Sequence, residues 1–199
     1  MFFKNYFLKE KIKQNSYFIW NNKNKNIQIV KKFKPLDLNL IIGVDNQKEI
    51  LFKNTINFAE GNFTNNALLW GARGNGKSSL IKSVFHAALV KNSNLKLIQL
   101  NKNNIFDIEY IYSLLEKYYY YRFIIFIDDL SFEKIDSDYK IIKSTLDGSI
   151  QNQPTNILLY VSSNRRHLMP RDMIDNERSS AIHTDESVEE KISLSDRFG

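Results

Sequence analysis

The sequence is poor in the residues that mark several large classes of protein. It has 199 residues, no cysteine, three prolines and seven glycines. The absence of cysteine excludes a disulfide framework and a thiolate metal site, and it fits a reducing compartment. No apolar run approaches the roughly 20 residues that a membrane-spanning helix needs, and charges interrupt the start of the chain too early for a secretory signal. We therefore expect a cytoplasmic protein without a membrane partner.

The positive charge of the chain is concentrated at its beginning. The formal net charge is +6, but residues 1–34 hold nine lysines and one acid, a local charge of +8, so the rest of the chain sums to −2. A lysine-rich, aromatic arm suits nucleic acid or an acidic partner. A solvated lysine face, in a chain rich in Lys, Asn and Ile, explains the same pattern. We favour the second explanation, and a nucleic-acid partner stays open.

The few glycines are clustered. Three of the seven fall within six positions of the stretch ALLWGARGNGKSS, residues 67–79. An apolar run, a glycine-rich loop and Lys-Ser match the phosphate-binding P-loop (Walker A), G-x-x-x-x-G-K-[ST]. Glycine lets the loop approach an anion without a Cβ clash, and the loop N–H groups then surround a phosphate at the start of a helix. The candidate nucleotide-binding residues are Gly71, Ala72, Arg73, Gly74, Asn75, Gly76, Lys77, Ser78 and Ser79.

Two of these residues have side-chain chemistry of their own. Lys77 supplies a point charge to the β- and γ-phosphates, and the Ser78 hydroxyl is a hard-oxygen ligand suited to Mg²⁺. The sequence therefore predicts a site for a nucleoside triphosphate with magnesium.

Strand and helix patterns alternate along the chain. Residues 16–33 carry two β-prone runs around a polar turn, which predicts a hairpin. A helix is expected over 46–59 with Asp45 as its N-cap. Further strands are expected over 67–70, 96–100, 123–127 and 156–162, and further helices over 77–90, 107–118 and 137–147. Strands separated by such helices imply an α/β fold, a parallel sheet with helices on both faces, and we divide the chain into an arm (1–34) and a nucleotide-binding core (35–199).

Two carboxylates follow a buried strand in the stretch FIIFIDD, residues 123–129. Ligands of open α/β sheets bind at the carboxyl ends of the strands. Asp128 occupies the position of the acid that holds Mg²⁺ in P-loop proteins, the Walker B site. Asp129 is placed to polarise an attacking water, and nearby Glu133 could do the same, so the choice between Asp129 and Glu133 stays open.

The next strand, ILLYVSS, ends in Asn164. A neutral amide at this place can orient a water beside the γ-phosphate without competing for its charge. Arg165 and Arg166 follow, and their partner stays open among nucleotide, a neighbouring subunit and nucleic acid. The three motifs together indicate an enzyme that hydrolyses a nucleoside triphosphate with Mg²⁺.

This order of motifs resembles that of the AAA+ ATPases. Four segments resemble, in their amino-acid sequence, an uncharacterised bacterial ATP-binding family known as domain of unknown function 815. They are LWGARG (69–74), DDLSFE (128–133), SNRRHLMP (163–170) and EEKISLSDRFG (189–199). The resemblance runs from about Pro35 to the last residue. It implies an AAA+ P-loop fold, ATP and Mg²⁺ as cofactors, and hydrolysis coupled to remodelling of an unknown partner.

The resemblance also implies roles for particular residues. Residues 40–43 match the segment that lies against the adenine, so Ile41 and Ile42 are candidates for that contact. Asn164 matches sensor 1. Arg197 matches the arginine finger that reaches the γ-phosphate of a neighbouring subunit in a homo-oligomer, a task that suits the planar, permanently charged guanidinium.

The chain departs from the AAA+ pattern at two places. AAA+ ATPases commonly have Asp-Glu where this chain has Asp128-Asp129, and the shorter side chain could leave the carboxylate too far from the water. The last strand and the helical lid that normally follow are expected to be missing from these 199 residues, which would leave the P-loop strand at the sheet edge. A low-turnover, ATP-dependent switch or loader that binds nucleic acid or a protein therefore stays open as the alternative function.

Overall fold

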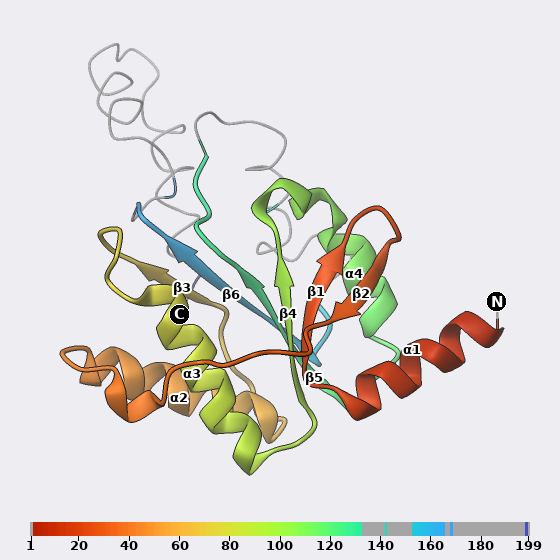
Figure 1. Ribbon diagram of the computed structural model, residues 1–199, viewed down its shortest axis with the longest axis horizontal. Coiled ribbons are helices and arrows are strands. Elements are labelled where there is room, and N and C mark those ends of the chain that lie inside the picture. Colours follow the sequence, from red (N-terminus) through yellow and green to blue (C-terminus); the bar gives the residue numbers. More distant parts are fainter. Residues whose placement is uncertain (1, 133–141, 143–152, 166–167, 169–197, 199) are drawn as a thin grey trace, which may run out of the picture.

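The computed structural model describes residues 2–132, 142, 153–165, 168 and 198. Within them the chain forms one six-stranded sheet with helices on both faces (Figure 1). The strands are β1 (Tyr17–Asn21), β2 (Asn26–Ile29), β3 (Ala67–Trp70), β4 (Leu95–Leu100), β5 (Arg122–Ile127) and β6 (Ile157–Ser163). The helices are α1 (Phe2–Gln14), η1 (Leu38–Leu40), α2 (Asp45–Ala59), α3 (Lys77–Lys91), η2 (Lys102–Asp107) and α4 (Ile108–Leu115), of which η1 and η2 are 3-10 helices.

The order of the strands is β2-β1-β4-β5-β6-β3. Every neighbouring pair runs parallel except the hairpin of β1 and β2, which is antiparallel. The predicted α/β class is therefore confirmed. Within the described part of the chain, β3 lies at one edge of the sheet, as we expected from the AAA+ strand that is missing beside it.

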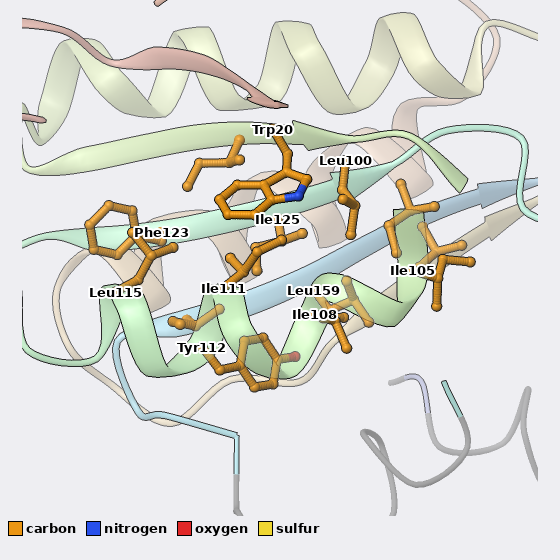
Figure 2. Close-up of a cluster of buried hydrophobic side chains, with 14 of the residues drawn as sticks. Trp20, Leu100, Ile105, Ile108, Ile111, Tyr112, Leu115, Phe123, Ile125 and Leu159 are labelled. Carbon is orange, nitrogen blue, oxygen red and sulfur yellow. The ribbon is translucent and has the colours of Figure 1, made fainter. Parts of the chain in front are cut away.

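Buried side chains form two clusters, one on each face of the sheet. Along β5, Phe123, Ile125 and Ile127 face the cluster that includes α1 and α4, whereas Ile124 and Phe126 face α2 and α3. Figure 2 shows the first cluster, in which α4 lies against the sheet beneath Trp20 of β1. Because both faces are covered, residues 123–127 of β5 and 157–161 of β6 are all apolar, which is why the sequence showed unbroken apolar runs there.

Two details of the expected helices are wrong. The predicted helix over 107–118 is shorter: α4 ends at Leu115, and η2 precedes it with a non-helical residue, Asn104. Asp45 does not cap α2, because the N-cap is Val44, and the Asp45 carboxylate instead pairs with Lys48 at 2.7 Å. The helix expected over 137–147 falls outside the described residues, residue 142 excepted. None of the described helices is both long and apolar enough to cross a bilayer.

The beginning of the chain is part of the sheet. The predicted hairpin is present, but β1 also pairs in parallel with β4, through Phe18 opposite Ile98 among others. Helix α1, which no sequence pattern predicted, buries Leu8 and Ile12 in the same cluster as α4. The division that we expected at residue 34 therefore does not coincide with a break in the structure.

A buried carboxylate ties the hairpin to η2. Asp107 is 4% exposed, and its two oxygens accept hydrogen bonds from Trp20 Nε1 at 2.7 Å and from Lys25 Nζ at 2.5 Å. A buried charge is tolerated when it is paired and hydrogen-bonded. Asp107 is such a case, and its partners come from residues more than 80 positions earlier in the chain.

We expect Asp107→Ala to lower the free energy of unfolding by about 1–3 kcal/mol, because the buried indole N–H of Trp20 loses its acceptor. Chemical denaturation followed by circular dichroism measures the change. The matched control is Glu109→Ala, an acid two positions further along that is exposed, with an expected change within about 0.5 kcal/mol. Equal stability of the two variants would contradict the structural role of Asp107.

Candidate functional site

The carboxyl ends of three parallel strands meet at one edge of the sheet. Trp70 at the end of β3 lies opposite Ser163 of β6, and Ile127 at the end of β5 lies opposite Val161 of β6. A cleft of about 360 Å³ opens where the chain leaves these strands. It is lined by Arg73, Gly74, Asn75, Gly76, Lys77, Ser78, Ser79, Asp128, Asp129, Ser162 and Asn164. The structure thus brings together the three motifs that the sequence predicted to converge.

The glycine-rich loop joins β3 to α3. Its last glycine, Gly76, has left-handed backbone angles (φ 74°, ψ 10°), a conformation that costs an L-residue with a Cβ about 1–2 kcal/mol. Helix α3 starts at the next residue, Lys77, and no side chain caps its first turn. The free N–H groups of that turn, with the positive end of the helix dipole, form an environment for an anion.

The Lys77 ammonium bridges the loop and the end of β6. It donates hydrogen bonds to the carbonyl oxygens of Gly71 and Ala72, both at 2.8 Å, and to Asn164 Oδ1 at 3.1 Å. These three acceptors are neutral, whereas a phosphate oxygen is anionic and forms stronger, charge-assisted hydrogen bonds. The ammonium is therefore positioned where a phosphate could exchange for the loop carbonyls.

Asp128 receives two hydroxyl groups on one carboxylate oxygen. Ser78 Oγ and Ser162 Oγ both donate to Asp128 Oδ1, the latter at 2.6 Å. The donor set of Ser78 and Asp128, a hydroxyl next to a carboxylate, consists of the hard oxygens that Mg²⁺ prefers. The described residues hold no group of three or more His, Cys, Asp and Glu that could bind a metal ion. A hydroxyl and a carboxylate supply only part of an octahedral shell, so phosphate and water would complete the ligands of a magnesium ion at Ser78 and Asp128.

Asp129 points to different partners from its neighbour. Its backbone is left-handed (φ 54°), and its carboxylate accepts a hydrogen bond from Asn164 Nδ2. The ammonium of Lys102, the first residue of η2, lies 3.9 Å from Asp129 Oδ2 and donates to the Asp129 carbonyl oxygen at 3.3 Å. Sequence reasoning missed Lys102, although its place just after β4, the strand next to β5, puts it at the same sheet edge.

Asn164 connects the two halves of the cleft. Its amide oxygen accepts from Lys77 and its amide nitrogen donates to Asp129. Arg165, whose role the sequence left open, donates from its guanidinium to the carbonyl oxygen of Phe132 at 3.1 Å. This contact ties the chain after Asp129 to the end of β6.

The residues expected at the adenine lie outside this cleft. Ile41 is half-buried against the cluster beneath α2 and α3, and Ile42 is 85% exposed. Val44, a little further along, instead lines a second cavity of about 690 Å³ between α2 and β3. The two cavities share Asn75 and Lys77. The contact of Ile41 and Ile42 with adenine stays a prediction. Glu133, Arg166 and Arg197 lie outside the described residues.

Burial shifts the pKa of several groups outside the cleft, among them a lysine and a tyrosine of the core. It lowers the pKa of Lys96 to about 8. It raises the pKa of Tyr160 to about 12, against the opposing effect of hydrogen bonds with Thr55 and Asn54. Both side chains belong to the packing of the sheet, and neither lines the cleft.

Several solved structures are similar to this chain at low sequence identity. The RuvB Holliday junction branch migration motor of Thermotoga maritima is 20% identical, with a TM-score of 0.49 over 70% of this chain and 44% of that chain. The HORMA:CdnC:Trip13 complex of E. coli MS115-1 is 13% identical, with a TM-score of 0.49 over 71% of this chain and 64% of that chain. PCH-2 of C. elegans is 17% identical, with a TM-score of 0.46 over 63% of this chain and 38% of that chain. The chain thus spans less than half the length of the RuvB structure.

No curated protein matches the sequence. A protein family matches residues 13–199, which is nearly the whole chain, and it is described as a protein of unknown function, DUF815. The match confirms the resemblance that the sequences of the four motif segments indicated. The chain belongs to the DUF815 family.

Proposed function

We propose that this protein is an AAA+ ATPase that binds and hydrolyses ATP with Mg²⁺. The observation that carries the proposal is that Lys77, Ser78, Asp128, Asp129 and Asn164 line one cleft although they come from three separate segments. They are also linked in pairs by hydrogen bonds: Ser78 with Asp128, Lys77 with Asn164, and Asn164 with Asp129. Such linkage supports a preorganised site, because each side chain is held by another member of the set.

The first half of the cleft suits the phosphates. The loop amides from Gly71 to Ser79 and the Lys77 ammonium would surround the β- and γ-phosphates. Ser78 and Asp128 would hold Mg²⁺, Asp128 through the water ligands of the ion. When bound, the ion neutralises charge on the phosphate oxygens.

The second half of the cleft suits the attacking water. Asn164 contacts both Lys77 and Asp129, so a water hydrogen-bonded to its amide would lie between the phosphate-binding cation and a carboxylate. Asp129 would accept the proton of that water. Glu133 is the alternative base and lies outside the described residues. Phosphoryl transfer depends mainly on positioning and electrostatics, which fits a site with few reactive groups.

The second cavity suits the nucleoside. It adjoins the cleft through Asn75 and Lys77, and its lining includes apolar side chains such as Val44, Leu51 and Leu80. Apolar walls with a few polar groups are typical of base and cofactor sites. We therefore place the base near Val44, and Ile41 and Ile42 stay candidates for the same role.

Assembly would complete the site. Arg197 of a neighbouring copy would reach the γ-phosphate as an arginine finger, an effect worth about 10³–10⁵ in rate where it occurs in trans. The rate per subunit would then rise with protein concentration. The energy of hydrolysis would remodel a partner whose identity stays open.

We expect Lys77→Ala to abolish ATP binding, because the variant removes the cation that faces the phosphates. Equilibrium titration with a fluorescent ATP analogue measures the affinity. Lys91→Ala is the matched control: it makes the same change at the exposed far end of the same helix and should keep wild-type affinity. Wild-type affinity in Lys77→Ala would contradict the phosphate site.

We expect Asp129→Asn to keep ATP binding and to lower turnover about 10²–10⁴-fold, the usual contribution of a general base. Asparagine keeps the size of the side chain and can still accept a hydrogen bond from Asn164, so the change removes mainly the proton acceptor. Phosphate release over time measures turnover. Normal turnover in Asp129→Asn would assign the base to another residue, and Glu133→Gln tests that alternative directly.

The second candidate function is an ATP-dependent switch with little turnover that binds single-stranded nucleic acid. The observation that favours it is the charge of residues 1–34, where lysines such as Lys9, Lys23 and Lys31 are exposed and Glu10 is the one acid. A polyanion held by such lysines would release counterions on binding.

If the switch is correct, binding to single-stranded DNA should weaken steeply with salt. The double variant Lys31→Gln/Lys32→Gln should reduce the slope of log affinity against log salt by about 0.7 for each lysine that contacts a phosphate. The control is Lys91→Gln/Lys117→Gln, two exposed lysines outside this segment. Phosphate release with and without DNA then distinguishes a switch from a steady ATPase. Absence of salt-dependent binding would rule this function out.

A further inference from the structure

We infer that Ser162 is a positioning residue that sets the geometry of Asp128 and Asp129 together. The inference rests on the proposed ATPase function and deepens it, since it concerns the metal-binding acid and the candidate base of that reaction. Ser162 lies in β6, one position before the end of the strand, and it is 1% exposed.

One hydroxyl group serves both acids. Ser162 Oγ donates to Asp128 Oδ1 at 2.6 Å and accepts from the backbone N–H of Asp129 at 2.9 Å. A serine hydroxyl has a single proton to donate. That proton is committed to Asp128, which fixes the rotation of the hydroxyl and presents its lone pairs to the Asp129 amide. The position of Asp128 and the turn at Asp129 are therefore coupled through one oxygen atom.

The turn at Asp129 is unusual for a residue with a side chain. Its φ of 54° lies in the left-handed region, which L-residues other than glycine rarely adopt. The hydrogen bond from the Asp129 N–H to Ser162 Oγ and that from the Leu130 N–H to the Ser162 carbonyl oxygen, at 2.8 Å, both support this turn. The turn directs consecutive carboxylates to different partners, Asp128 to Ser78 and Asp129 to Asn164.

Replacement of Ser162 by alanine removes its hydroxyl hydrogen bonds to Asp128 and to the Asp129 N–H. It keeps the hydrogen bond from the Leu130 N–H to the Ser162 carbonyl oxygen. Asp128 would keep the hydrogen bond from Ser78, and the P-loop with Lys77 would be untouched. The expected loss therefore falls on magnesium-dependent steps and on turnover, whereas affinity for nucleotide without magnesium should remain. Groups that orient metal ligands typically change metal affinity or activity about 10–100-fold.

The neighbouring serine offers a matched control. Ser163 is also fully buried in β6, and its hydroxyl likewise donates one hydrogen bond, to the Leu130 carbonyl oxygen at 2.6 Å, and accepts one, from the Arg165 N–H at 3.0 Å. It contacts neither carboxylate. Ser163→Ala should therefore lower stability as Ser162→Ala does, with no change in the magnesium requirement.

The experiment compares the full-length wild type with Ser162→Ala, Ser162→Thr and Ser163→Ala. Four quantities are measured: kcat for ATP, KM for ATP, the affinity for a fluorescent ADP analogue as a function of Mg²⁺ concentration, and the denaturant midpoint. Ser162→Ala should lower kcat and raise the half-saturating Mg²⁺ concentration, each about tenfold or more, with unchanged ADP affinity in the absence of Mg²⁺. Ser162→Thr keeps the hydroxyl and should recover most of both losses.

The inference is overturned if Ser162→Ala keeps the wild-type kcat and magnesium requirement, or if Ser163→Ala raises that requirement equally. A folded Ser162→Thr variant without recovery overturns it as well. If threonine does not fit the buried position and the variant fails to fold, the comparison of the two alanine variants decides. A wild type that neither binds nor hydrolyses ATP would instead contradict the proposed function.

Discussion

The parallel pairing of β6 between β5 and β3 is the constraint on which the cleft depends. The register sets Trp70 opposite Ser163 and Ile127 opposite Val161, so the three chain segments leave the sheet side by side. A slip of one residue in β6 would turn Ser162 away from the acids and bring Ser163 toward them, because side chains alternate between the faces of a strand. The hydrogen bonds of the cleft are thus a consequence of register.

Polar groups at the opposite ends of the same strands help to hold this register. Apolar alternation alone is a weak guide, because both faces of β5 and β6 are covered by apolar side chains. Asn66, just before β3, accepts a hydrogen bond from the Leu159 N–H of β6 at 2.8 Å and exchanges side-chain hydrogen bonds with Gln153. These contacts specify where β6 lies against β3, far along the strands from the cleft.

Local sequence pattern predicted the strands that form the site well. The apolar runs of β3, β5 and β6 and the loop from Gly71 to Gly76 appear where the sequence indicated, within one or two residues. The carboxyl-edge rule for parallel sheets then predicted that Asp128 and Asn164 would lie beside the P-loop, where they contact Ser78 and Lys77. The remaining site residues depend on which strands are neighbours. Lys102 and Ser162 become informative once β4 and β6 are known to flank β5, and no pattern within either segment shows that order.

The hairpin of β1 and β2 is part of the sheet through the pairing of β1 with β4, so the first 34 residues cannot be deleted without disturbing the fold. Strand β1 pairs with the edge of β4, and the indole N–H of Trp20 donates a hydrogen bond to the buried carboxylate of Asp107. Deletion of this segment would expose Ile98 and Leu100 to solvent. It would also leave the buried Asp107 carboxylate without its two hydrogen-bond donors. A deletion of residues 1–34 would therefore lose nucleic-acid binding through misfolding. Variants that neutralise the lysines in the whole chain test their contribution to binding without this complication.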